Sequence, residues 1–135
     1  MTDRPTHGST EPHGGVYDWY TRGMDLLATG NPAAAATLLS PAADAEPESP
    51  SLREALARAQ FDAGQYEDSA ESFGRIVERN PVDDYARFGL GLAYSRVGRL
   101  REAAEHLALA FAMRPEHKQY ARVLQRVRSR LAAAQ

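Results

Sequence analysis

The chain has 135 residues, of which 24 are Ala and 13 are Leu, whereas only 6 are Val and 1 is Ile. Ala and Leu favour helices and β-branched residues favour strands, so this composition predicts one all-α domain. The formal net charge of −2 argues against a strongly basic nucleic-acid-binding protein, and the lack of Cys excludes disulfides, thiolate zinc sites and cysteine nucleophiles.

Residues 1–15 are rich in Thr, Pro, Gly and His and contain no apolar segment. This composition predicts a disordered N-terminal tail before a single domain over residues 16–135, and it lacks the apolar core of a signal peptide. The longest apolar run covers only residues 107–113, which is too short to cross a membrane. We therefore expect a cytoplasmic protein without a membrane partner.

A 34-residue period runs through residues 16–117. It divides the chain into three units, residues 16–49, 50–83 and 84–117. The residues that recur at this spacing are chain-breaking Gly and Pro together with small or apolar positions. They are Gly30, Gly64 and Gly98; Pro47, Pro81 and Pro115; Ala36, Ala70 and Ala104; and Leu39, Phe73 and Leu107.

Each unit is predicted to be a helix, a tight turn at the central Gly and a second helix. The glycines suit the left-handed backbone that ends a helix, and the prolines close each unit because they cannot continue one. After Gly64, residues Tyr66, Ala70, Phe73 and Val77 restart a helical apolar period. In the first unit, Pro41 falls within the second helix, so we expect that helix to be kinked or shortened.

Residues 118–133 form a further half-unit. Tyr120, Leu124, Val127 and Leu131 make an apolar stripe along it, and many of the remaining residues are Arg. This pattern predicts a helix that covers the third unit and presents a charged outer face to solvent.

The pattern resembles the tetratricopeptide repeat family, in which W-x2-L-G-x2-Y, A-x3-F and P recur every 34 residues. This resemblance implies a right-handed α-solenoid of three helix-turn-helix repeats with a capping helix. The residues that match the family pattern include Trp19, Gly23, Ala35, Leu39 and Pro47 in the first unit; Leu56, Ala57, Phe73 and Pro81 in the second; and Leu90, Gly91, Tyr94, Ala103, Leu107 and Pro115 in the third.

The resemblance also implies a concave groove that holds a peptide segment. Family members that clamp the free carboxylate of a chaperone tail use Lys and Asn, but Tyr20, Met24, Glu54 and Arg58 stand at those positions here, so that activity is not expected. The groove positions carry aromatic residues and Met at one end and Arg at the other. They are Tyr17, Tyr20, Met24, Leu27, Glu54, Arg58, Phe61, Tyr85, Phe88, Leu92, Arg96, Arg122, Arg126 and Arg130.

These residues suggest an apolar peptide with acidic flanks. The expected anchors are Tyr20, Phe61, Tyr85 and Phe88, because aromatic side chains bury a large area on binding. The expected anionic contacts are Arg96, Arg122 and Arg126, because Arg grips carboxylates with two hydrogen bonds.

Catalysis is not expected, because phosphate-binding loops, nucleophile elbows and H-E-x-x-H metal motifs are missing and the four His are scattered. We expect no cofactor and no metal. Two alternatives to peptide binding remain open. One is self-association as a homo-oligomer, through the oppositely charged ends of the chain or through the C-terminal helix. Residues 1–83 carry 14 acidic and 6 basic residues, and residues 84–135 carry 4 acidic and 10 basic residues. The other is nucleic-acid binding through the Arg-rich C-terminal helix.

Overall fold

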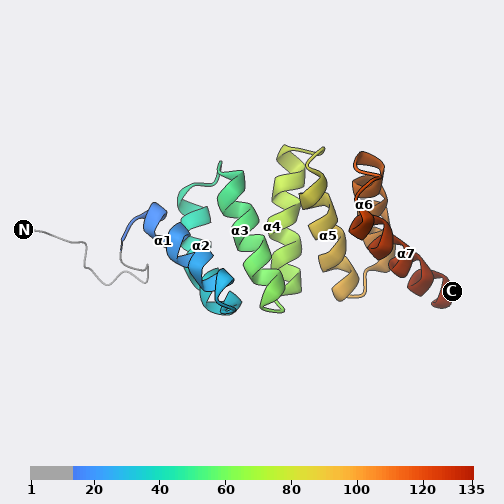
Figure 1. Cartoon of the computed structure of the whole chain (residues 1–135), viewed down its shortest axis with the longest axis horizontal. Coiled ribbons are helices and arrows are strands. Elements are labelled where there is room, and N and C mark those ends of the chain that lie inside the picture. The colour runs from blue at the N-terminus through green and yellow to red at the C-terminus, as the bar shows by residue number, and fades with distance from the viewer. Residues whose placement is uncertain (1–13) are drawn as a thin grey trace, which may run out of the picture.

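The computed structural model of the chain describes residues 14–135, and within them the backbone forms seven helices and no strand (Figure 1). The expected disorder of residues 1–15 concerns a segment that lies almost entirely outside the described residues. The all-α solenoid expected from the sequence is confirmed. The helices are α1 (Val16–Ala28), α2 (Pro32–Ala45), α3 (Pro50–Asp62), α4 (Tyr66–Arg79), α5 (Asp84–Arg96), α6 (Leu100–Met113) and α7 (Lys118–Ala133).

The turns inside the three helix pairs are made by Gly30, Gly64 and Gly98. Their φ angles are 84°, 82° and 85°, which is the left-handed region that side chains disfavour. At the second turn, Gln65 N–H donates to the Gln60 carbonyl at 2.8 Å, a bond that satisfies one of the free carbonyls at the end of α3.

Close helix crossings depend on glycine. A Cβ on Gly23 would lie 2.6 Å from Leu39, and one on Gly91 would lie 2.7 Å from Leu107, so these pairs of helices could not approach as closely with any other residue. Leu39 and Leu107 are fully buried. The 34-residue period therefore marks repeated contacts between the two helices of a pair.

The helix α2 differs from the sequence expectation at Pro41. It spans 14 residues, as α4 and α6 do, so the proline does not shorten it. Tertiary packing explains this result, because Leu39, Ala42 and Ala43 around the proline are all buried and hold the helix in place.

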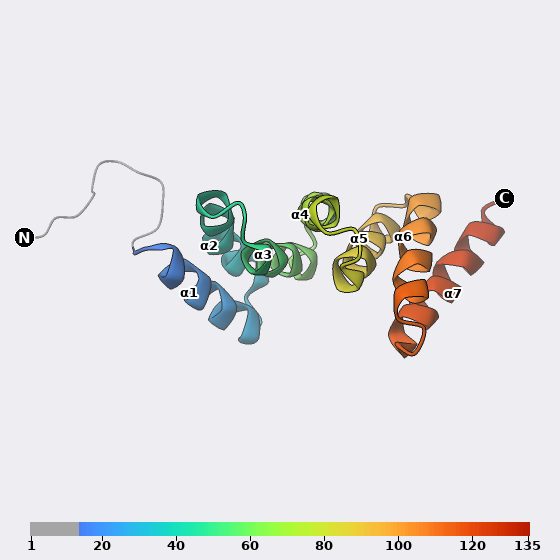
Figure 2. The ribbon, with the colours of Figure 1, turned by 90° about the horizontal axis from the view of Figure 1, so that it is seen from above.

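The helices form two rows. Figure 2 shows α1, α3 and α5 along one side of the array and α2 and α4 along the other. Successive members of the row α1, α3, α5 and α7 touch one another, whereas α2 does not contact α4 and α4 does not contact α6. Since spacing is closer in the first row, the array curves toward it, and this row forms the inner surface.

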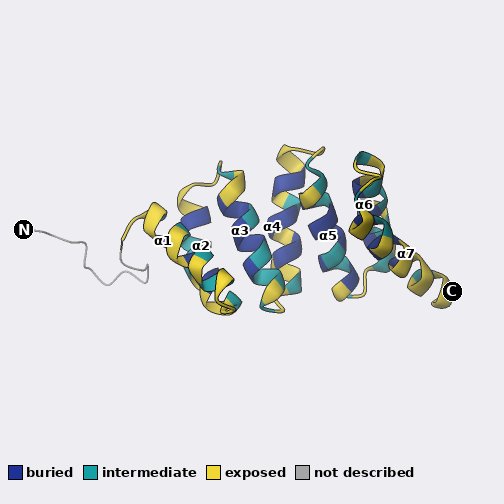
Figure 3. Cartoon of the chain, viewed as in Figure 1, coloured by how far each residue is buried: buried dark blue, intermediate teal, exposed yellow. Residues whose placement is uncertain are grey.

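Three apolar clusters follow one another along the array. The first joins α1, α2 and α3, the second joins α3, α4 and α5, and the third joins α5, α6 and α7. Figure 3 shows that buried residues run through the central helices, while α1 and the end of α7 are mostly exposed. No helix within residues 14–135 combines the length and the apolarity that a membrane span requires.

Candidate functional site

A hollow of about 270 Å³ opens between α3 and α5. Both helices belong to the inner row, and Phe73 of α4 lies between them. We call this feature the inner hollow. It is lined by Arg58, Phe61, Asp62, Phe73, Tyr85, Phe88, Gly89 and Leu92.

The floor of the inner hollow is an aromatic surface. Phe73 of α4 is 2% exposed, and its ring lies against Gly89 of α5, where a Cβ would come within 2.5 Å of the ring. Tyr85 packs edge-on against Phe73 with 6.0 Å between ring centroids, yet it remains 39% exposed. The hollow therefore presents accessible aromatic area above a rigid, buried support.

One wall contains a second aromatic group covered by a cation. Phe61 and Tyr66 pack edge to face with 5.1 Å between centroids. The Arg96 guanidinium lies over both rings, 5.2 Å from the Phe61 centroid and 5.4 Å from the Tyr66 centroid, and its Nη1 donates to the Tyr66 hydroxyl at 2.9 Å. This cation–π arrangement fixes Arg96 beside Phe61 while its side chain stays at the surface.

Charged groups of both signs surround Tyr85. Burial raises the pKa of the Glu54 carboxyl, and the positive charge of Arg58 opposes that rise. Burial also raises the pKa of the Tyr85 hydroxyl, where Arg58 again acts in the opposite direction to Glu54 and Asp62. The α3 side of the inner hollow thus carries charges of both signs, with the Arg58 cation between the Glu54 and Asp62 carboxylates along the helix.

Five of the groove residues expected from the sequence meet in the inner hollow, namely Arg58, Phe61, Tyr85, Phe88 and Leu92. Phe88 differs from the expectation in one respect. It is 4% exposed and stacks on Tyr120 of α7 with 4.5 Å between centroids, so its ring belongs to the third apolar cluster. Phe88 supports the wall and is not an accessible anchor.

The remaining expected groove residues lie elsewhere on the array. Tyr20, Met24 and Leu27 of α1 pack partly buried against the first cluster, and Tyr17 is 80% exposed. The α7 residues Arg122, Arg126 and Arg130 are exposed, and none of them lines the inner hollow.

Two important residues of the site were not among the expected groove positions. Gly89 is a glycine in a helix interior, which is a sequence signal of close approach, but the sequence does not say to what. Tyr66 begins α4, in the outer row, and lies behind the wall of the inner hollow, where it packs on Phe61 and accepts a hydrogen bond from Arg96. Within residues 14–135, no group of three or more His, Asp or Glu is placed to hold a metal ion.

Comparison with known proteins adds a family match. A family model described as "Tetratricopeptide repeat" matches residues 26–87 and again residues 61–127. No curated protein matches the chain significantly.

Several solved structures share the fold. The first tetratricopeptide domain of Spaghetti (RPAP3), bound to the HSP90 peptide SRMEEVD, is 19% identical with a TM-score of 0.80, covering 93% of this chain and 99% of that one. The Sgt2 domain of Aspergillus fumigatus is 21% identical with a TM-score of 0.79, covering 93% and 85%. MamA of Desulfovibrio magneticus RS-1 is 22% identical with a TM-score of 0.82, covering 87% of this chain and 66% of that longer one.

Proposed function

Because this chain belongs to the tetratricopeptide repeat family, we propose that it is a non-catalytic protein-interaction module whose inner hollow binds a peptide segment of another protein. The observation that carries the proposal is the aromatic surface of exposed Tyr85 and half-buried Phe61 on the inner row, supported from below by buried Phe73. Rigid aromatic side chains in a concave site are typical anchors of protein recognition.

The chemistry of the inner hollow suits one apolar side chain of the peptide. Its volume of about 270 Å³ accommodates a Leu, Met or Phe side chain rather than a folded domain. The lining residues include no His, and none of them pairs a nucleophile with a base, so the arrangement supports binding rather than catalysis.

Charge sets the expected direction of the peptide. Glu54 and Asp62 lie on the α3 side of Tyr85, whereas Arg96 lies at the end of α5 and Arg122 and Arg126 lie on α7. We therefore expect acidic residues of the peptide to lie toward α7. A modest site of this size corresponds to micromolar affinity, about −8 kcal/mol.

A peptide-display selection tests the proposal. The wild-type chain is the bait, Tyr85→Ala is the counter-selection, and enriched peptides are then measured by fluorescence polarisation. We expect an apolar residue followed or preceded by Asp or Glu, and a loss of affinity of about tenfold or more in Tyr85→Ala.

Tyr17→Ala is the matched control, because Tyr17 is also an exposed tyrosine but lies on α1, away from the inner hollow. Its affinity should equal that of the wild type. Peptides that bind Tyr85→Ala and the wild type equally would contradict the assignment of the site, and a selection without enrichment would contradict the proposed function itself.

A further inference from the structure

A second cavity, of about 630 Å³, lies where the α2–α3 loop and the start of α3 face the end of α4. We call it the Arg53 pocket. It shares no lining residue with the inner hollow, so a ligand of this pocket is independent of the peptide proposed above. Three of its lining residues are Arg53, Arg75 and Arg79.

Arg53 is a nearly buried charge with too few partners. The residue is 8% exposed, and the hydrogen bond it makes within the described chain runs from Nη2 to the Ala43 carbonyl at 3.5 Å, the outer limit for such a bond. Buried guanidinium groups are normally paired with a carboxylate, but no carboxylate of residues 14–135 forms a salt bridge with Arg53. Arg53 Nε and Nη1 donate no hydrogen bond within residues 14–135, and they are not sealed from solvent, so they can reach a ligand in the pocket.

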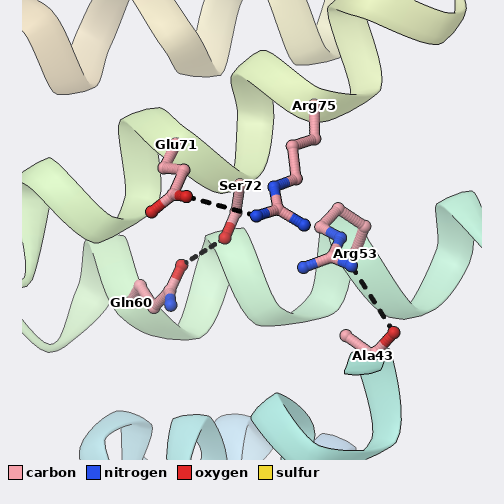
Figure 4. A network of polar contacts seen from close by, with 6 residues as sticks. All are labelled: Ala43, Arg53, Gln60, Glu71, Ser72 and Arg75. Atoms are coloured by element: carbon pink, nitrogen blue, oxygen red, sulfur yellow. Dashed lines mark hydrogen bonds and ion pairs between the residues drawn. The ribbon is translucent and has the colours of Figure 1, made fainter. Parts of the chain in front are cut away.

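Arg75 brings a second cation to the same place. Figure 4 shows the guanidinium groups of Arg53, from α3, and Arg75, from α4, near one another, the first directed at the Ala43 carbonyl and the second at Glu71. Burial lowers the pKa of Arg53 and the charge of Arg75 lowers it further, whereas the carboxylates of Asp44 and Glu71 act in the opposite direction. An Arg remains protonated at neutral pH. Arg75 Nη2 is bonded to Glu71 at 3.3 Å, which leaves its other donors free for a shared ligand.

The charged groups at the rim are one cation, Arg79, and three carboxylates, those of Glu48, Glu78 and Asp83. Arg79 forms an ion pair with Glu48, and the Asp83 carboxylate accepts a hydrogen bond from Ala86 N–H at 3.0 Å as the cap of α5. Glu78 is an exposed carboxylate on the rim. The interior of the pocket is thus more cationic than its entrance.

We propose that the Arg53 pocket binds an oxyanion, a carboxylate or a phosphate group, between the guanidinium groups of Arg53 and Arg75. Arg donors are arranged as a planar fork that fits two oxygens of such a group, and a negative charge placed there removes the repulsion between the two cations. The oxyanion is either free in solution or carried on an acidic peptide.

Thermal unfolding in phosphate and in chloride, at matched ionic strength, is the first measurement. The wild-type chain should melt at a higher temperature in phosphate if the pocket takes a free oxyanion. The same measurement with a phosphoserine peptide and with an unphosphorylated glutamate peptide, both blocked at their ends, shows whether a peptide carries the group. Titration calorimetry then gives each dissociation constant.

Two variants locate the effect. Arg53→Met keeps the length of the side chain and is compatible with folding, because an apolar residue is well tolerated where a charge was buried. Arg75→Gln changes an exposed residue. Each should weaken binding of the effective probe by about tenfold or more, since one charge-assisted interaction is lost.

Arg101→Gln is the matched control, because Arg101 is an exposed Arg of α6 outside the pocket, and it should bind like the wild type. Glu78→Gln removes a negative charge from the rim and should tighten binding. The proposal is overturned if none of the three probes binds, or if Arg53→Met and Arg75→Gln bind as well as Arg101→Gln does.

Discussion

Gly89 has no side chain, and this makes room for the Phe73 ring that forms the floor of the inner hollow. The Phe73 ring occupies the space that a Cβ would need, and Tyr85 packs on the same ring. A single glycine in α5 thus positions two aromatic residues from two helices. The sequence shows this glycine, but its partner Phe73 becomes evident only when α4 and α5 are packed together.

Gly89→Ala should lower the free energy of unfolding by about 1–2 kcal/mol, because the Phe73 ring must move away from the new methyl group. Gly74→Ala is the control within α4, where a Cβ meets nothing within 4 Å. It should raise the free energy of unfolding by about 0.5–1 kcal/mol, since Ala favours the helix. Urea unfolding measures both, and equal stabilisation by the two variants would contradict the close contact.

His106 makes the stability of the chain dependent on pH. Arg87 Nη1 donates to His106 Nδ1 at 3.3 Å, which requires the neutral imidazole, and burial followed by the charge of Arg87 lowers the pKa of His106. The unfolded chain therefore takes up this proton first as the pH falls below the ordinary value of about 6.5.

We expect the wild-type chain to lose more stability on acidification through this range than His106→Gln, which offers Arg87 an acceptor that does not titrate. Urea midpoints on either side of the ordinary histidine pKa measure the difference. An identical loss in both proteins would show that His106 contributes nothing to the pH dependence.

The exposure of the Phe88 side chain could not be predicted from the sequence. The 34-residue period places it on the inner row, which is where it lies. Whether its ring faces the hollow or the next helix depends on Tyr120, 32 positions later, which takes up one face of the ring in a stack. Periodicity assigns a residue to a helix face, but packing between repeats decides its exposure.

Among the elements, helix α2 departs most from its counterparts, because it carries Pro41 in its interior. The positions one and two repeats later hold Arg75 and Leu109, which have the backbone N–H that Pro41 lacks. The sequence correctly predicts that the proline lies inside the helix. The predicted shortening of the helix does not occur, because the buried contacts of α2 outweigh one lost hydrogen bond.

Pro41→Ala should stabilise the chain by about 1–2 kcal/mol, since it restores a helical hydrogen bond and removes the clash of the proline ring with the preceding turn. Pro32→Ala is the control in the same helix. Pro32 is the first residue of α2, where proline is favoured, so its replacement should be neutral or slightly destabilising. Chemical unfolding of both variants measures the effect, and destabilisation by Pro41→Ala would contradict the expected release of strain.

At the scale of the whole molecule, the chain is a linear array in which helices contact only near neighbours. The pairs α1–α2 and α6–α7 make no contact with each other, and each has its own apolar cluster. The 34-residue period predicts this organisation directly. It does not predict the two cavities, because each is formed by residues from two or three helices whose spacing is set by packing.

Leu39→Ala and Leu107→Ala should therefore affect opposite ends of the array. Each removes a fully buried side chain, at a cost of about 2–5 kcal/mol. In a repeat array such a loss acts mainly on neighbouring helices. Amide hydrogen exchange should accelerate most in α1 and α2 for Leu39→Ala, and most in α5, α6 and α7 for Leu107→Ala. Uniform acceleration in both variants would mean that the array unfolds as one unit.

The central claim is that the inner hollow is the site where this module binds a peptide. Titration of the isotope-labelled chain with a selected peptide, followed by amide chemical shifts, tests it most directly. We expect the largest shifts on α3 and α5, around Arg58, Tyr85 and Leu92, and we expect them to vanish in Tyr85→Ala while they persist in Tyr17→Ala. Shifts confined to α2, α4 and α6, on the outer row, would contradict the claim.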